Sequence, residues 1–200
     1  MRALVLNCTL KKSPARSNTQ ALADVVIQAL RDLQVEVSVE RVVDHTIPFG
    51  VETDLGDGDE WPRLHDAILA SEILVIATPT WIGRPASVAQ MVLERMDAMI
   101  SEQNDDGSYV AYNRVAGVVV TGNEDGAHHV ISEIAGGLVD IGFTIPAQAW
   151  TYWNMGPGPG PSYTETDHKH DWSESTGKTM AANLVAVAAA LKAQPIPPAG

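Results

Sequence analysis

The chain has 200 residues, of which 45% are apolar, and this is enough for one globular domain with a substantial core. Its formal net charge of −12 argues against a nucleic-acid partner, because phosphate backbones require clustered Lys and Arg. The single cysteine, Cys8, excludes a disulfide framework and a cysteine-based zinc site. Since no apolar run approaches the ~20 residues of a membrane span and the N-terminus does not read as a signal peptide, we expect a cytoplasmic protein without a membrane partner.

Strand and helix patterns alternate along the chain. Short uninterrupted apolar runs are typical of buried parallel strands, and apolar residues three and four positions apart predict helices. In chain order, the sequence predicts strand 3–7, helix 18–33, strand 35–43, helix 64–70, strand 73–77, helix 87–99, strand 115–121, helix 127–140, strand 143–145 and helix 173–192. Five strands separated by helices predict an α/β three-layer sandwich with right-handed crossovers.

The chain reads as a single domain. The Gly-Pro alternation over residues 155–162 is not helix or central strand, but only one helix follows it, which is too little for a second domain. We therefore expect one domain over residues 1–194 and a loose C-terminal tail over residues 195–200.

The most informative segment is the loop after the strand at 73–77. Its sequence, Thr-Pro-Thr-Trp-Ile-Gly over residues 78–83, opens directly into the next predicted helix. Open α/β sheets hold their ligands at this edge, beside a helix N-terminus. Pro79 stiffens the loop, Gly83 lets the backbone approach a ligand closely, and Trp81 offers a flat apolar surface. The loop therefore suits a planar, partly polar cofactor.

The loop after the first strand, residues 8–17, is rich in hydroxyl and cationic side chains and leads into the first helix. Ser17, Asn18 and Thr19 lie where helix N-caps lie, beside free N–H groups and the positive end of the helix dipole. A phosphate monoester would fit there, with a cation such as Lys11 adding charge. The alternative is that Ser17 only caps its helix.

Together with residues 121–126 (Thr-Gly-Asn-Glu-Asp-Gly), these two loops resemble the flavodoxin-like NAD(P)H-dependent FMN reductase family. The first loop of that family usually runs Gly-Ser-x-Arg-x-x-(Ser/Gly)-Asn-Thr, and its third-strand loop runs Thr-Pro-x-Tyr-x-Gly. The corresponding segments here are 9–19 and 78–87, and the resemblance extends from residue 1 to about residue 153. This chain departs from the pattern with Cys-Thr in place of Gly-Ser, and with Trp81 in place of Tyr.

The resemblance implies a five-stranded parallel sheet in the order 2-1-3-4-5, with FMN bound non-covalently at the carboxyl ends of strands 1, 3 and 4. The residues implied to hold the phosphate are Thr9, Lys11, Ser17, Asn18 and Thr19. The residues implied to line the ribityl chain and the ring are Pro79, Thr80, Trp81, Ile82 and Gly83. The residues implied at the pyrimidine edge are Thr121, Gly122, Asn123 and Gly126.

The implied activity is ping-pong transfer of a hydride from NADPH or NADH through FMN to a flavin, a quinone or a similar small acceptor. The implied assembly is a homodimer or homotetramer whose site is completed at an interface. Because a flavin does the organic chemistry itself, we assign no catalytic residue. The aromatic residues Trp150, Tyr152 and Trp153, expected just after the fifth strand, would wall the site or an interface, or simply pack together.

Two other functions are open. Strong acidity also suits a flavodoxin-type electron carrier, which docks onto basic partners and has no substrate of its own. A less favoured alternative is an enzyme like the low-molecular-weight phosphatases and arsenate reductases, with Cys8 as nucleophile. Here Cys8 and Arg16 are spaced as Cys-x7-Arg, two residues more than the Cys-x5-Arg loop of those enzymes, and the chain has no Asp-Pro pair to supply their general acid.

We predict no metal site. The histidines at 128–129 and 168–170 lack an acidic partner four residues on, and adjacent helical histidines point about 100° apart. The acidic residues Asp54, Asp57, Asp59 and Glu60 lack the spacing of a calcium loop and are expected to be solvated.

Overall fold

The computed structural model describes residues 1–158 and 160–198. The strands are β1 (Arg2–Asn7), β2 (Glu36–Arg41), β3 (Ile73–Trp81), β4 (Arg84–Pro85), β5 (Val115–Gly122) and β6 (Trp150–Asn154). The α-helices are α1 (Asn18–Asp32), α2 (Trp61–Leu69), α3 (Ser87–Met96), α4 (Ala127–Ile141) and α5 (His170–Ala193). Three short 3-10 helices are η1 (Val42–Asp44), η2 (Asp97–Ile100) and η3 (Tyr163–Glu165).

The sheet confirms the predicted α/β architecture. Its strands lie in the order β2-β1-β3-β5-β6, and every neighbouring pair along this path is parallel. Counted without β4, this is the predicted order 2-1-3-4-5. The short β4 pairs antiparallel with the end of β3, where Trp81 lies opposite Arg84.

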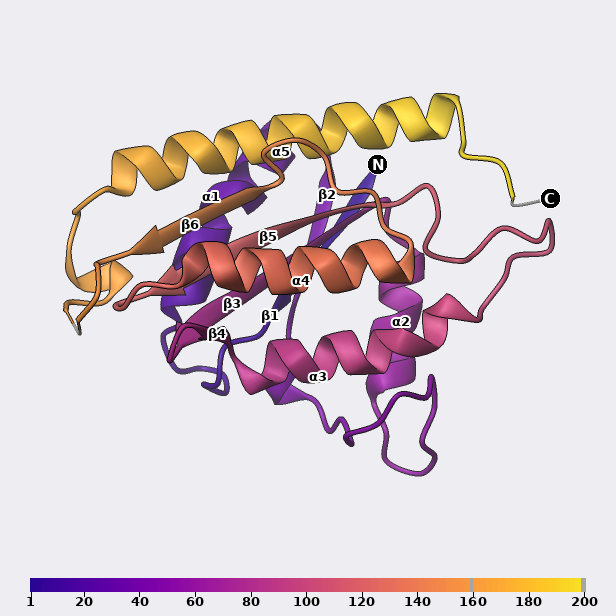
Figure 1. Cartoon of the computed structure of the whole chain (residues 1–200), viewed down its shortest axis with the longest axis horizontal. Coiled ribbons are helices and arrows are strands. Elements are labelled where there is room, and N and C mark those ends of the chain that lie inside the picture. The colour runs from indigo at the N-terminus through magenta and orange to yellow at the C-terminus, as the bar shows by residue number, and fades with distance from the viewer. Residues whose placement is uncertain (159, 199–200) are drawn as a thin grey trace.

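Two layers of helices cover the sheet (Figure 1). Successive residues of a strand point to opposite faces, so β1 contributes Leu4 and Leu6 to the core beneath α2, α3 and α4. It contributes Ala3 and Val5 to the core beneath α1 and α5. Burial on both faces explains the uninterrupted apolar runs that predicted these strands.

The predicted fifth strand at 143–145 was wrong. Thr144 makes only an isolated bridge to Val115, accepting a hydrogen bond from the N–H of Ala116 at 3.0 Å. Proline at 146 has no N–H for a ladder, and Gln148 turns the chain with a φ of 50°. The chain then re-enters the sheet as β6, so the expected post-strand aromatics belong to the edge strand itself.

One of the acidic residues that we expected to be solvated, Asp59, forms a buried ion pair instead. Asp59 and Arg95 have side chains that are 1% and 0% exposed, and their charged atoms are 2.6 Å apart. The Arg95 guanidinium also donates to the backbone carbonyls of Pro48, Glu52 and Thr53. Arg95 therefore fastens the loop before α2 onto α3, and Asp59 is structural where we expected it to be solvated.

Near the end of the described chain, Ile196 contacts Asn113. Ile196 donates its N–H to the side-chain oxygen of Asn113 at 2.7 Å and accepts from the same amide at 3.3 Å. Residues 199–200 of the expected tail and residue 159 of the Gly-Pro segment lie outside the described residues, and the single-domain boundaries stay a prediction. Over the described residues, no helix is both long and apolar enough to cross a bilayer.

Candidate functional site

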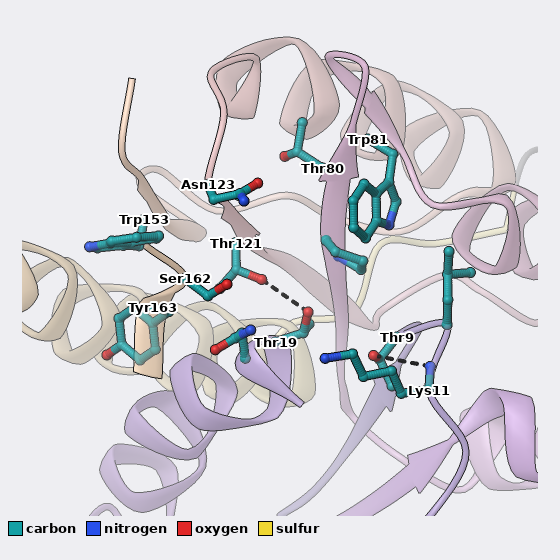
Figure 2. Close-up of a pocket in the computed structure, with 14 residues that line it drawn as sticks. Thr9, Lys11, Thr19, Thr80, Trp81, Thr121, Asn123, Trp153, Ser162 and Tyr163 are labelled. Carbon is teal, nitrogen blue, oxygen red and sulfur yellow. Dashed lines mark hydrogen bonds between the residues drawn. The ribbon is translucent and has the colours of Figure 1, made fainter. Parts of the chain in front are cut away.

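A cavity of about 170 Å³ lies at the carboxyl ends of β1, β3 and β5. Figure 2 shows Trp81 and Lys11 on one side of it and Trp153 and Tyr163 on the other. Its lining residues are Thr9, Leu10, Lys11, Asn18, Thr19, Pro79, Thr80, Trp81, Thr121, Gly122, Asn123, Trp153, Ser162 and Tyr163. Segments far apart in the sequence thus meet at the sheet edge that the loop chemistry indicated.

The cavity brings together most of the predicted cofactor-binding residues. Four of those predicted residues are absent from its lining: Ser17, Ile82, Gly83 and Gly126. Contact between any of the predicted residues and a flavin stays a prediction. Sequence reasoning missed three lining residues, which are Leu10, Ser162 and Tyr163, whereas Trp153 was among the aromatic residues expected to wall the site, an interface or a packed cluster.

The start of α1 forms one wall. Ser17 caps the helix, accepting from the backbone N–H of Gln20 at 3.1 Å, which supports the capping interpretation of this residue. The side-chain oxygen of Asn18 accepts from both the N–H and the hydroxyl of Thr164, at 3.0 and 2.8 Å. Its amide nitrogen is therefore the atom that would donate to a ligand. The hydroxyls of Thr19 and Thr121 lie 2.9 Å apart in the floor.

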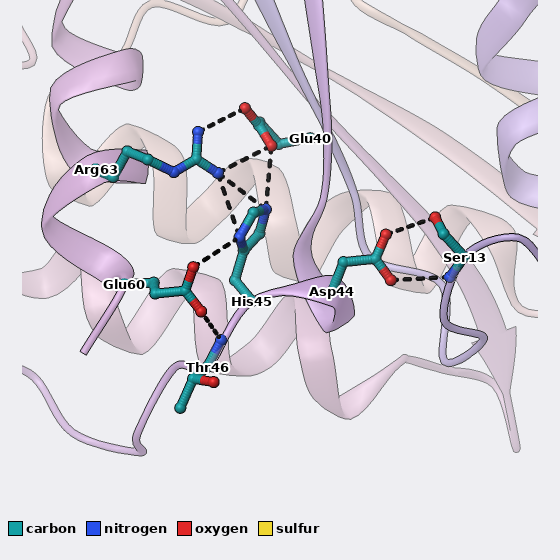
Figure 3. Close-up of polar contacts among 7 residues, drawn as sticks. All are labelled: Ser13, Glu40, Asp44, His45, Thr46, Glu60 and Arg63. Carbon is teal, nitrogen blue, oxygen red and sulfur yellow. Dashed lines mark hydrogen bonds and ion pairs between the residues drawn. The ribbon is translucent and has the colours of Figure 1, made fainter. Parts of the chain in front are cut away.

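The loop after β1 is held in shape by Arg41 at the end of β2 and by Asp44 in η1. Arg41 donates to the carbonyls of Lys11 and Ala15, at 3.3 and 2.8 Å. Asp44 accepts two hydrogen bonds from Ser13, through the backbone N–H at 2.8 Å and the hydroxyl at 2.5 Å (Figure 3). The loop that carries Lys11 into the cavity is thus fixed by groups outside the cavity.

A polar cluster anchors the chain immediately after Asp44. The ring of His45 lies between Glu40 and Glu60, at 3.1 and 3.5 Å, with Arg63 alongside (Figure 3). A hydrogen bond from Arg63 holds the pKa of Glu40 below its usual value, although partial burial acts in the opposite direction. This cluster connects η1 to α2 and so supports the position of Asp44.

The end of β3 presents an unpaired hydroxyl to the cavity. Thr80 Oγ1 is buried and has no hydrogen-bond partner among the described residues. Such a group costs free energy unless a ligand or water satisfies it. Neighbouring Thr78 differs, because its hydroxyl donates to the carbonyl of Pro79 and accepts from the N–H of Ala86. Thr80 is therefore available to a ligand, whereas Thr78 is structural.

Two predicted glycines serve loop packing at the rim of the cavity. Gly126 has a φ of 107°, and a Cβ atom there would lie 2.7 Å from the Cα of Gly83. Gly83 itself has a φ of 71°. The loops after β3 and β5 can therefore touch because Gly126 lacks a side chain, whereas a Cβ atom at Gly83 would meet open space and glycine is favoured there by its positive φ alone. Between Trp81 and Gly83, the side chain of Ile82 is 89% exposed.

The wall of the cavity opposite Trp81 is aromatic and combines Trp153 with Tyr163, which the sequence did not indicate. The indole of Trp153 donates to the carbonyl of His168 at 2.6 Å and meets Tyr163 edge to face at a centroid distance of 5.5 Å. Tyr163 stacks on His170 at 4.0 Å, and burial raises the pKa of its hydroxyl. The Ser-x-x-Glu spacing at 162–165, which forms a capping box here, is the sequence signal that would have located this turn.

Cys8 is unsuited to act as a nucleophile. Its side chain is fully buried and does not line the cavity, and burial raises the pKa of the thiol. The reactive form of cysteine is the thiolate, so the structure argues against the phosphatase-like alternative. Over residues 1–158 and 160–198, no three His, Cys, Asp or Glu side chains gather as metal ligands.

Comparisons with known proteins bear on this site. The sequence profile described as NADPH-dependent FMN reductase matches residues 1–151. The chain is 39% identical over 166 residues to 8-demethyl-8-aminoriboflavin-5'-phosphate synthase of Streptomyces davaonensis, covering 78% of this chain and 64% of that protein. It is 38% identical over 200 residues to a Mycobacterium bovis protein named divalent metal cation transporter MntH, covering 96% of this chain and 29% of that protein. The chain therefore spans less than two thirds of either relative.

Among solved structures, RosB with its bound intermediate 8-demethyl-8-formylriboflavin-5'-phosphate is similar to this chain over almost its full length. The two share 38% sequence identity with a TM-score of 0.90. The match covers 98% of this chain and 82% of the RosB chain.

Proposed function

Because the chain belongs to the NADPH-dependent FMN reductase family, we propose that it is an FMN-dependent oxidoreductase that takes a hydride from NADPH or NADH and delivers it to a flavin, a quinone or a similar small acceptor. The observation that carries this proposal is the cavity at the sheet edge, into which the loops after β1, β3 and β5 bring hydroxyl, amide and cationic groups. FMN, when bound, supplies the ring that accepts and releases the hydride. The residues of this chain bind that group and orient it.

The polar groups that line the cavity fit a flavin phosphate. Lys11, the hydroxyl of Thr9 and the N-terminal end of α1 suit the phosphate, because helix N-termini and ammonium groups both attract anions. The unpaired hydroxyl of Thr80 and the amide of Asn123 suit the polar ribityl chain and ring edge.

The size of the cavity leaves part of FMN outside it. Enclosed small-molecule sites usually measure about 300–1,000 Å³, whereas this cavity measures about 170 Å³. Trp81 is 50% exposed beside it, and Ile82 is more exposed still. These exposed apolar side chains support a homodimer or homotetramer in which a second copy covers the remaining ring. Sedimentation equilibrium of the FMN-loaded protein tests this assembly, and a monomer at all concentrations would contradict it.

An absorbance titration tests the activity. The purified protein is mixed with FMN, freed of the excess, and treated anaerobically with NADPH or with NADH. We expect retained flavin bands that bleach with at least one nucleotide and recover when a quinone is added. Bands that bleach only with dithionite would contradict the reductase and favour the electron carrier. Failure to retain any flavin would contradict a tightly bound FMN cofactor and favour a flavin that binds only as a substrate.

The similarity to RosB favours a second candidate, in which the flavin phosphate is the substrate. That protein was crystallised with a riboflavin-phosphate intermediate, and 38% identity extends over nearly the whole of this chain. Mass spectrometry of the flavin recovered after turnover separates the two candidates. An unchanged mass supports FMN as a cofactor, and an altered mass supports FMN as the substrate.

A further inference from the structure

A second cavity lies beside the edge strand of the sheet. It measures about 370 Å³ and is lined by Tyr152, Trp153, Asn154, Lys169 and Trp172. Its volume falls in the range of small-molecule sites. The lining comes from β6 and from the turn into α5, two elements that pack against each other (Figure 1). From this lining, we propose that the second cavity binds a planar aromatic molecule that carries an anionic group.

Trp172 and Tyr152 give the second cavity its aromatic surface. Trp172 remains 43% exposed, although burying an indole is strongly favourable. It meets Tyr152 edge to face at a centroid distance of 4.8 Å, and Tyr152 in turn meets His128 at 4.9 Å. Tyr152 is therefore fixed by rings on two sides, and Trp172 keeps accessible surface beside it. Flat apolar surfaces of this kind favour flat aromatic ring systems, which stack on them or meet them edge to face.

The charge preference rests on Lys169. It is the one charged residue in the lining of this cavity, as far as the structure describes the chain. Its side chain is exposed and has no ion-pair partner in the described part of the protein. A φ of 59° at this residue turns the chain into α5 and carries Lys169 to the cavity. Asn154 adds an amide that hydrogen-bonds to carboxylates and sulfonates.

The second cavity is distinct from the first, although one side chain serves both. Trp153 lines the two cavities, but the other lining residues differ. Tyr152, Lys169 and Trp172, which give the second cavity its aromatic and cationic groups, do not line the first cavity. The inference does not rest on the proposed reductase activity, and it is testable without a nucleotide.

The test measures binding of anthraquinone-2-sulfonate to the FMN-loaded protein by isothermal titration calorimetry in the absence of NADPH and NADH. We expect one molecule bound per chain. Trp172→Ala should weaken binding about ten-fold because the ring contact is lost. Trp172→Phe should restore most of the affinity. Lys169→Gln should weaken binding of the sulfonate roughly three- to five-fold, and it should leave the uncharged 2-(hydroxymethyl)anthraquinone unaffected.

Two substitutions serve as matched controls. Phe49→Ala removes an aromatic side chain that is 81% exposed in another loop, and Lys178→Gln removes an exposed cation farther along α5. Both should bind the probe as the parent does. The inference is overturned if the parent does not bind, or if Trp172→Ala binds equally well. It is also overturned if Trp172→Ala changes the sedimentation coefficient, because the face would then be covered by a second copy. Retention of FMN, followed separately by absorbance, reports on the proposed function alone.

Discussion

Asp44 and Ser13 are joined by two hydrogen bonds, in which one carboxylate accepts from both the N–H and the hydroxyl of the same residue. These bonds, with the hydroxyl contributing most, hold the pKa of Asp44 below its usual value. The contact is therefore complete at neutral pH and is lost only as the pH falls through that lowered pKa. Asp44 lies outside the cavity, but it restrains the loop on which Lys11 is carried.

Replacing Asp44 with Ala should weaken FMN binding, because the loop that contacts the phosphate loses its restraint while the contacts to the rest of the flavin stay unchanged. We expect the Kd for FMN to rise about three- to ten-fold, which corresponds to the loss of one or two hydrogen bonds that preorganise the loop. Riboflavin lacks the phosphate, so its Kd should not change. Fluorescence titration with both flavins measures the ratio, and Asp57→Ala in an exposed loop is the control. An equal loss of affinity for both flavins would show that Asp44 merely supports the fold.

Thr80→Val should separate ligand binding from stability. The substitution removes a buried hydroxyl that has no protein partner, so the flavin-free protein should unfold at the same or a higher urea concentration. The Kd for FMN should rise by about ten-fold if this hydroxyl binds the ligand. Thr78→Val is the contrast, because it breaks two hydrogen bonds within the protein and should lower stability by about 1–2 kcal/mol. Unchanged FMN affinity in Thr80→Val would remove Thr80 from the site.

Gly126→Ala should disturb the contact between two loops. Its Cβ would lie 2.7 Å from Gly83, and the backbone φ of 107° disfavours any side chain. We expect a loss of about 1–3 kcal/mol in the free energy of unfolding, with weaker FMN binding. Gly136→Ala is the matched control, since a Cβ there meets open space within α4 and should stabilise by about 0.5–1 kcal/mol. Equal unfolding midpoints for the two variants would contradict this interpretation.

Arg95→Met should destabilise the protein strongly. The side chain is fully buried and satisfies Asp59 together with three backbone carbonyls, so its removal should cost about 3–5 kcal/mol in urea unfolding. Arg63→Met breaks an exposed pair with Glu40 and should cost less than about 1 kcal/mol. Similar values for the two variants would show that burial does not strengthen the Arg95 contacts.

The Asp59–Arg95 pair also predicts that the stability of the protein depends on pH. Burial raises the pKa of Asp59, but hydrogen bonds from Arg95 and from the N–H groups of Trp61 and Leu55 outweigh it, so the pKa is lowered on balance. A carboxyl group whose pKa is lower in the folded state stabilises the protein at every pH above its unfolded-state pKa of about 3.9. This stabilisation is lost as the pH falls through the folded-state pKa. The stability difference between the parent and Asp59→Asn should therefore be constant from pH 7 to about 5 and shrink below about 3.9. A difference that is independent of pH down to 2.5 would contradict it.

Local patterns predicted most of the sheet and the loops after β1, β3 and β5 that reach the cavity, but not the turn that brings Ser162 and Tyr163 to it. Val5, Val75 and Val119 lie in runs that are buried on both faces, so composition alone was sufficient there. The position of the edge strand β6 could not be predicted from composition. The run at 143–145 has strand-like residues, but Trp150–Asn154 became the strand because the turn at Pro146 and Gln148 determines where the chain returns to β5.

The remaining errors have the same physical origin. Asp59 appeared to be one of several solvated acidic residues because its partner, Arg95, is 36 residues away in sequence. Tyr163 follows a Gly-Pro segment without periodicity, and its place in the cavity depends on stacking with His170 and on the contact between Asn18 and Thr164. Contacts of this range leave no periodic trace in the sequence.

The bond between Asn18 and Thr164 spans 146 residues and has a consequence for synthesis. The loop after β1 and the start of α1 emerge from the ribosome early, but the wall that closes on them emerges only with Thr164. Until then, a nascent chain can form much of the sheet but has no complete cavity. Ligand binding stabilises only conformations that contain the site. A flavin in the surrounding solution would therefore favour chains that have been extended past this turn and would leave shorter nascent chains unassisted.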